Sequence, residues 1–135
     1  MKALFDTHCL LWWLSEPGQL NARVRTLLAE NENELYLSAI SALEIAIKWQ
    51  LGKLTLPEPP ETFVSRVVRE QSLIPLPVRQ DHALAVASLP RKHSDPFDRV
   101  LICQSLIEDL PIITADRALR SYDARLIWAG RRAAR

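Results

Sequence analysis

The sequence has few of the residues that small proteins use for cross-linking or for glycine-rich loops. Its two cysteines, Cys9 and Cys103, lie in apolar stretches without CxxC spacing, which excludes a disulfide framework and a multi-cysteine zinc site. Its three glycines, Gly18, Gly52 and Gly130, lie far apart and form no phosphate-binding loop. We therefore expect two buried, reduced thiols and a fold stabilised by an ordinary hydrophobic core.

Long hydrophobic runs and a strong net charge are also missing. No apolar run is long enough to cross a bilayer, and Asp6 interrupts the apolar start too early for a secretory signal peptide. We therefore expect a cytoplasmic protein without membrane contact. The formal net charge of +1 does not by itself identify a nucleic-acid binder, so local patches such as Arg91-Lys92-His93 must decide that question.

The length and composition fit one globular domain. With 135 residues, of which 48% are hydrophobic and 24% charged, the chain is long enough for a single core. We expect one domain over residues 1–130, followed by a basic, solvated tail at residues 131–135.

Short apolar runs alternate with segments of helical periodicity. We expect strands at residues 2–5, 35–38, 73–78, 110–114 and 125–128, and helices at 21–29, 41–51, 61–70, 81–87, 96–106 and 115–120. This alternation predicts parallel strands joined by right-handed crossovers. The fold class is therefore α/β, a three-layer α/β/α sandwich with a central parallel sheet of four or five strands. Pro75 and Pro77 favour an edge position for the third strand.

Four carboxylates follow the strand-like runs or open the helix-like ones: Asp6, Glu44, Asp98 and Asp116. They are scattered along the chain, and no local pattern brings them together. In a parallel sheet, however, the carboxyl ends of the strands and the first turns of the following helices lie at one edge, where sites form. We therefore expect the four acids to meet in one cleft.

Capping explains each acid equally well when it is taken alone, because helix N-termini favour anions. Asp6 and Asp116 would cap the helices after their strands. Asp98 would be a first-turn acid after Asp95, which is expected at the N-cap before Pro96. Another cap is expected at Asp81, for the short helix that follows.

The alternative for Glu44 is a capping box. If the second long helix begins at Ser41, Glu44 completes the S-x-x-E pattern three residues later. Lys48, four residues further on, would then form a helical ion pair with Glu44.

A metal ion would reconcile four acids in one cleft. Carboxylates at close range raise one another's pKa or require a cation between them. A ligand set of oxygens alone, with no cysteine or histidine, suits Mg²⁺ or Mn²⁺ better than Zn²⁺. Because Mg²⁺ is commonly bound by a few carboxylates, water and substrate phosphate, the pattern points to phosphodiester hydrolysis.

Four segments in this order resemble the PIN-domain ribonucleases, and more narrowly the VapC-type toxins of bacterial toxin–antitoxin pairs. The segments are Leu4-Phe5-Asp6-Thr7-His8, Ser38-Ala39-Ile40-Ser41-Ala42-Leu43-Glu44-Ile45, Asp95-Pro96-Phe97-Asp98-Arg99 and Ile113-Thr114-Ala115-Asp116. The resemblance covers nearly the whole chain. It implies a PIN-like sandwich, Mg²⁺- or Mn²⁺-dependent cleavage of RNA, a homodimer, and a small cognate antitoxin that blocks the site.

The resemblance also implies roles for individual residues. Asp6 and Asp98 would be the principal metal ligands, with Asp116 as a further one, and Glu44 and Asp116 would help to position or deprotonate the attacking water. Hydrogen bonds to the acids are expected from Thr114 and Thr7. Candidates for contact with RNA are Arg91, Lys92, His93 and Arg99.

Two other classes of function stay open on the sequence. An aspartyl-phosphate phosphatase would use Asp6 as its nucleophile, but such enzymes commonly place a second aspartate where this chain has His8. A non-catalytic RNA-binding or regulatory module would keep the fold without cleaving RNA. A receiver-like regulator would need a lysine after a late strand, and residues 112–128 contain none.

Overall fold

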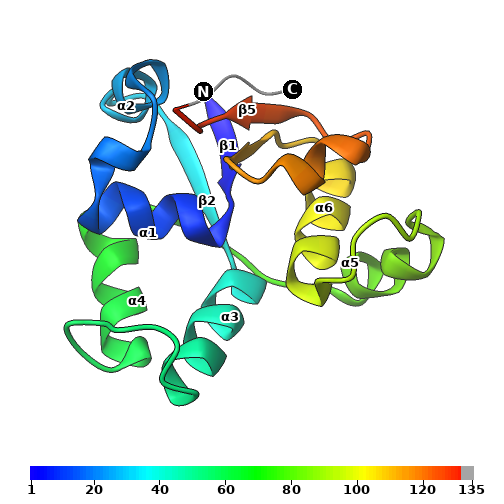
Figure 1. The fold of residues 1–135 in the computed structure, drawn as a ribbon, viewed down its shortest axis with the longest axis horizontal. Helices are drawn as coiled ribbons and strands as arrows, with labels where there is room; N and C mark the ends of the chain where they lie inside the picture. Colours follow the sequence, from blue (N-terminus) through cyan, green and yellow to red (C-terminus); the bar gives the residue numbers. More distant parts are fainter. Residues whose placement is uncertain (132–135) are drawn as a thin grey trace.

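The computed structural model describes residues 1–131 and has a five-stranded parallel sheet in the order β3-β2-β1-β4-β5 (Figure 1). The strands are β1 (Lys2–Phe5), β2 (Glu34–Ser38), β3 (Ile74–Leu76), β4 (Ile112–Thr114) and β5 (Leu126–Trp128). The α-helices are α1 (Thr7–Ser15), α2 (Ala22–Leu28), α3 (Ala39–Gln50), α4 (Pro60–Glu70), α5 (Gln80–Ala85) and α6 (Pro96–Glu108). Short 3₁₀ helices occur at η1 (Pro17–Gln19), η2 (Val86–Ser88) and η3 (Arg117–Ser121). The expected α/β sandwich and the edge position of the third strand are confirmed.

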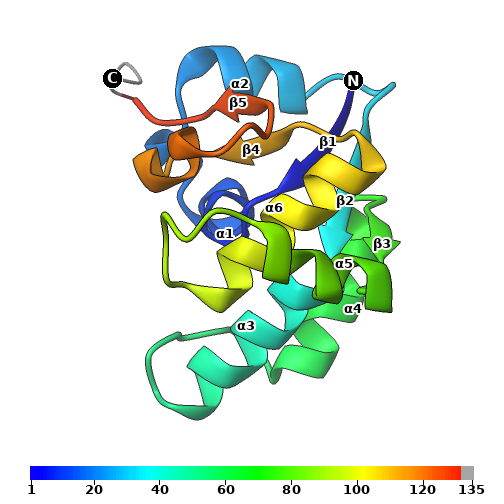
Figure 2. The ribbon, with the colours of Figure 1, turned by 90° about the vertical axis from the view of Figure 1, so that its right-hand side faces the viewer.

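Helices cover both faces of the sheet. Helices α1, α2 and α4 lie on one face, while α5 and α6 lie on the other (Figure 1), and Figure 2 shows α5 and α6 in front of the strands. Side chains of β1 alternate between the two cores: Ala3 and Phe5 belong to the first and Leu4 to the second. Phe5 also stacks on Trp13 of α1 at 5.3 Å between ring centroids. Apolar burial on both faces therefore fixes the central strand.

The sheet brings distant segments together at the carboxyl end of β1. Strand β1 pairs with β2 on one side and with β4 on the other, so the strand order reverses at this point. Ligand sites of open α/β sheets form at such reversals. Helix α3 lies at the same edge and packs against α1, α4 and α6.

Two expected helix starts are wrong. Helix α3 begins at Ala39, and Ser38 is its N-cap, with its Oγ accepting a hydrogen bond from the Ile40 N–H at 3.0 Å. Ser41 therefore does not open the helix, because β2 runs directly into it. Asp81 does not cap α5 either: it lies in the first turn, and its carboxylate accepts hydrogen bonds from Arg79.

Other expectations are confirmed or remain untested. Asp95 is the N-cap of α6, accepting from the Phe97 N–H at 2.9 Å. Across residues 1–131 we find no helix that combines the length and the apolar character needed to span a bilayer. The basic tail predicted at residues 131–135 falls, apart from Arg131, outside the described residues.

Candidate active site

Asp6 directly follows β1 and is almost fully buried, with 7% of its surface exposed. Its Oδ1 accepts a hydrogen bond from the His8 N–H at 3.3 Å, so it does cap α1. Its Oδ2 accepts the Thr114 hydroxyl at 2.7 Å. Capping uses only one of its oxygens, and a residue 108 positions away holds the other. A helix cap alone does not explain this second contact.

Asp116 follows β4, the strand beside β1. Its Oδ1 accepts from the Ala118 N–H at 2.9 Å, which caps η3 as expected. Its own N–H donates to the Thr114 hydroxyl oxygen at 3.0 Å. The fully buried Thr114 therefore binds Asp6 and Asp116 at once, and this is how it supports the acids.

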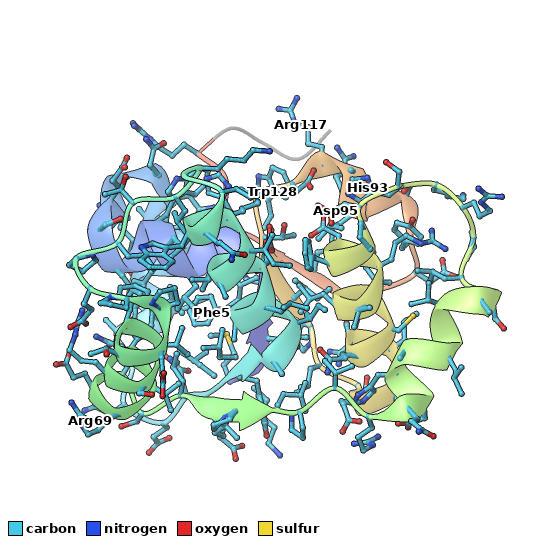
Figure 3. The ribbon with its side chains drawn as sticks, turned by 90° about the horizontal axis from the view of Figure 1, so that it is seen from below. Phe5, Arg69, His93, Asp95, Arg117 and Trp128 are labelled. Carbon is cyan, nitrogen blue, oxygen red and sulfur yellow. The ribbon has the colours of Figure 1, made fainter. Side chains whose placement is uncertain are left out.

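Asp98 lies in the first turn of α6, and His93 lies in the loop before this helix. His93 Nε2 is 2.8 Å from Asp98 Oδ2. Figure 3 labels His93 and Asp95 near the start of α6. The loop thus folds back so that an imidazole binds the carboxylate.

Glu44 lies in the second turn of α3 and is 7% exposed. The capping box with Ser41 does not form, because Ser41 instead accepts the Thr7 hydroxyl at 2.8 Å. The predicted ion pair does form: Lys48 Nζ donates to Glu44 Oε2 at 2.6 Å. Thr7 thus joins the first turns of α1 and α3 and does not bind an acid directly in this structure.

The four acids share one cleft of about 500 Å³. Its lining includes Asp6, Glu44, Asp98 and Asp116. It also includes Asp95, Lys48 and Lys53, and the α1 residues His8 and Trp12. The structure therefore brings the scattered acids together in one cleft, as expected from the strand order.

Burial raises the pKa of Asp6 above its ordinary value. The hydrogen bonds from Thr114 and His8 lower it in part, while the charges of Asp116 and Glu44 raise it further. A buried carboxylate with acidic neighbours on two sides is stabilised by a cation.

Burial also raises the pKa of Asp98, to about 6. The hydrogen bond from His93 opposes this shift, and the charges of Asp6, Asp95 and Asp116 add to it. Asp98 thus loses its proton near pH 6, and a divalent cation can take the place of that proton.

The carboxylates of the cleft suit a hard divalent cation, but the tightest group of possible ligands also includes the imidazole of His93, so the expectation of oxygen ligands alone does not hold for this group. One ligand atom each from His93, Asp98 and Asp116 lie within 4.8 Å of one another. Ligands of one Mg²⁺ ion lie ~2.1 Å from it and so at most ~4.2 Å apart, which needs only a small side-chain adjustment here. Asp6 is not part of this tighter group, and the metal ligand set Asp6, Asp98 and Asp116 stays a prediction. The contact between the His93 imidazole and the Asp98 carboxylate is of the kind that orients a metal ligand.

The basic residues proposed for RNA contact differ in their surroundings. Arg91 and Lys92 are exposed in the loop before α6, away from the cleft lining. The Arg99 guanidinium donates to the backbone oxygens of Pro90, His93, Val86 and Leu89, and to the Tyr122 hydroxyl. Arg99 therefore holds the loop that carries His93, whereas contact with RNA stays a prediction for all four residues.

Two residues that contact the acids were not expected to do so as parts of the site. His93 was considered only for RNA, because nothing in the sequence shows that residues 90–95 fold back over the helix start. Lys48 was considered only as a helical partner of Glu44, yet it lines the cleft, and its pKa is raised chiefly by Glu44 and also by Asp95 and Asp98. The i,i+4 spacing was the available signal for Lys48.

Comparison with known proteins agrees with the fold. A relative, ribonuclease VapC22 of Mycobacterium tuberculosis, is 29% identical over 120 residues, which are 88% of this chain and 90% of the relative. Among solved structures, VapBC2 from Rickettsia felis bound to a DNA fragment from their promoter has a TM-score of 0.71 at 13% identity, covering 96% of this chain and 99% of that one. FitAcB from Neisseria gonorrhoeae has a TM-score of 0.63 at 23% identity, covering 94% and 96%. Residues 3–125 match the family model of the PIN domain, and the chain therefore belongs to the PIN domain family.

Proposed function

We propose that this protein is a Mg²⁺- or Mn²⁺-dependent endoribonuclease that acts as the toxin of a toxin–antitoxin pair. The observation that carries the proposal is the meeting of Asp6, Glu44, Asp98 and Asp116 in one cleft. The name of the Mycobacterium tuberculosis relative, a ribonuclease, supports the reaction. The Rickettsia felis VapBC2 complex, a two-component assembly of similar fold, supports a protein partner.

The proposed reaction is attack of water on an RNA phosphodiester. A divalent cation bound by Asp6, Asp98 and Asp116 would supply charge for the phosphate and acidify the water. Thr114 holds Asp6 in place, and His93 orients Asp98 through the hydrogen bond at 2.8 Å.

Glu44 is the residue we assign to positioning the water or accepting its proton. It needs no N-cap role in this fold, since Ser38 caps α3. Lys48, 2.6 Å from Glu44 and partly exposed at the cleft, supplies a positive charge beside the path of an incoming phosphate.

The partners are part of the proposal. A small antitoxin encoded beside this protein would block the cleft, and a second copy of the chain would form a homodimer. Large apolar side chains stay exposed on α3 and α6, which supports protein contacts at these helices. They are Leu43, Trp49, Leu106 and Ile107.

The proposal is tested by removing one charge at a time from the cleft. Purified Asp6→Asn and Asp98→Asn should cleave RNA at least ~100-fold more slowly than the unmodified protein in Mg²⁺ or Mn²⁺, because each loses a ligand charge. Asp123→Asn, the same change at an exposed position, is the matched control and should cleave normally. If either cleft variant keeps the full rate, the site assignment is wrong.

The rival functions give different results in the same assay. A phosphatase would form a covalent phosphate on Asp6 and leave RNA intact. A non-catalytic module would bind RNA equally well with and without a chelator and would not cleave it. Induction of the protein in a bacterial host should arrest growth, and both Asp98→Asn and the co-expressed neighbouring small protein should relieve the arrest.

A further inference from the structure

A second groove adjoins the acidic cleft. It has a volume of about 510 Å³ and shares Trp12, Ala115 and Asp116 with the cleft. Its other walls come from Gln19, Arg117, Trp128, Gly130 and Arg131. Because three residues belong to both hollows, a flexible chain lying in the cleft can continue into the groove.

Trp128 is a partly exposed aromatic side chain at the end of β5. Its indole lies over Gly130, where an added Cβ would come within 3.0 Å of Cζ2 and 3.1 Å of Nε1. Any larger residue at position 130 would displace the ring. The absence of a side chain at Gly130 therefore leaves room for the indole, which lines the groove.

The backbone beneath this ring is held rigidly against the active site. Asn21 Nδ2 donates to the backbone oxygens of Trp128 at 2.9 Å and Gly130 at 3.0 Å. The Ala129 N–H donates to the Thr114 carbonyl at 2.8 Å. Since Thr114 also holds Asp6, these hydrogen bonds fix the backbone that carries the indole relative to the acids.

The groove differs from the cleft in charge. The cleft is lined by six acids and two lysines, whereas the groove has Arg117 and Arg131 with Asp116 as its one acid among the described residues. Arg117 is exposed and directly follows Asp116 in the chain. Figure 3 labels Arg117 and Trp128 on the same side of the molecule as His93 and Asp95. An aromatic face with neighbouring arginines is the combination that binds single-stranded nucleic acid.

We propose that this groove binds the nucleotide next to the cleaved phosphate, with its base stacked on Trp128 and its phosphate contacted by Arg117. This rests on the proposed ribonuclease function and adds to it. The substrate must be unpaired at this nucleotide, because only an unstacked base can cover the indole. The groove therefore selects single-stranded or looped RNA.

The test separates binding from cleavage. In an Asp98→Asn background, affinity for a fluorescein-labelled single-stranded RNA of about ten nucleotides is measured by anisotropy. Trp128→Leu should weaken binding about 10-fold, while Trp128→Phe keeps a stacking face and most of the affinity. Gly130→Ala should also weaken binding, although the tryptophan is still present, because the new Cβ displaces the ring.

Arg117→Gln gives a second, electrostatic readout. The plot of log affinity against log salt concentration should lose about one unit of slope, because one phosphate contact is lost. Matched controls are Leu84→Ala, an exposed apolar residue on α5, and Arg69→Gln, an exposed arginine on α4. Both should bind RNA normally, and circular dichroism identifies any variant that has not folded.

Each outcome decides between this proposal and the proposed function. If the unmodified protein cleaves RNA but the folded Trp128, Gly130 and Arg117 variants bind RNA normally, the groove assignment is wrong and the nuclease stands. If these variants bind RNA normally and lose only the antitoxin, the groove is a protein site and the assignment is again wrong. If RNA binds through Trp128 but is never cleaved, the groove stands and the nuclease fails.

Discussion

Thr114 is the residue on which the arrangement of two acids depends. Its hydroxyl donates to Asp6 and accepts from the N–H of Asp116, and its side chain is fully buried. The resemblance predicted that Thr114 forms hydrogen bonds with the acids. The particular link to Asp6 depends on the pairing of β1 with β4, because only this pairing brings the two residues together.

Thr114→Val keeps the size of this side chain and removes both hydrogen bonds. RNA cleavage and metal affinity should fall about 10- to 100-fold, as for other residues that orient a metal ligand. Stability should fall by about 1–3 kcal/mol, because buried polar groups of Asp6 and Asp116 lose a partner. Cleavage rates and urea unfolding measure the two effects. Thr114→Ser, which keeps the hydroxyl, is the control, and a valine variant as active as wild type would contradict the role.

At the scale of elements, the loop before α6 depends on one arginine of that helix. Five oxygen atoms accept hydrogen bonds from the Arg99 guanidinium, four of them backbone oxygens between residues 86 and 93. The loop in turn brings His93 to Asp98. Arg99 thus acts on the site through the loop, without needing to touch substrate.

Arg99→Lys should loosen the loop, because an ammonium cannot reproduce the planar set of donors. We expect faster amide hydrogen exchange over residues 86–95 and a cleavage rate reduced by about 10-fold. Exchange followed by mass spectrometry, together with the cleavage assay, measures both. Arg125→Lys is the matched control, since Arg125 also donates to a backbone oxygen, that of Asp109, but lies at an exposed site. Unchanged exchange in the Arg99 variant would exclude the proposed clamp.

The sequence predicted the elements well where apolar burial determines them. All five strands lie within the predicted segments, apart from one extra residue at the start of β2, because a parallel strand covered on both faces needs a short apolar run. The edge position of β3 was predictable from Pro75. The meeting of the four acids in one cleft was predictable too, because it follows from the strand order and the positions of the helix first turns.

Helix starts and loop contacts were harder to predict. Ser38 and Ser41 are both suitable N-cap residues for α3. The residue at which β2 ends decides between them, and no local sequence pattern encodes that residue. Asp81 resembles a cap, but Arg79 draws its carboxylate away. The contact of His93 with Asp98 depends on how a loop folds, and this is set by the distant hydrogen bonds of Arg99.

At the scale of the whole molecule, a near-neutral chain gathers its acids at one edge of the sheet. The net charge is +1, yet Asp6 and Asp98 both have pKa values raised by burial and by neighbouring acids. The metal-free fold therefore contains a local repulsion that increases as these groups ionise. Apolar cores on both faces of the sheet support the fold against this repulsion, so removal of metal should abolish activity without unfolding the protein.

The pH dependence of stability gives the last prediction. Because the pKa of Asp98 is raised from 3.8 to about 6 in the folded protein, its contribution to stability is present below pH 3.8 and is lost as the pH rises through about 6. A divalent cation binds the ionised form, so Mn²⁺ should raise Tm by roughly 5 °C at about pH 8 and far less at about pH 5. Differential scanning fluorimetry in chelator and in Mn²⁺ measures this difference.

Asp98→Asn separates this linkage from general effects of metal and pH. At about pH 8 in chelator, the variant should be more stable than wild type, because it removes one charge from a group of acids. It should also lose most of the Mn²⁺-induced rise in Tm, whereas the exposed control Asp123→Asn should keep it. A Mn²⁺ effect of equal size at both pH values, or one that survives in Asp98→Asn, would show that the cation stabilises the protein at another site.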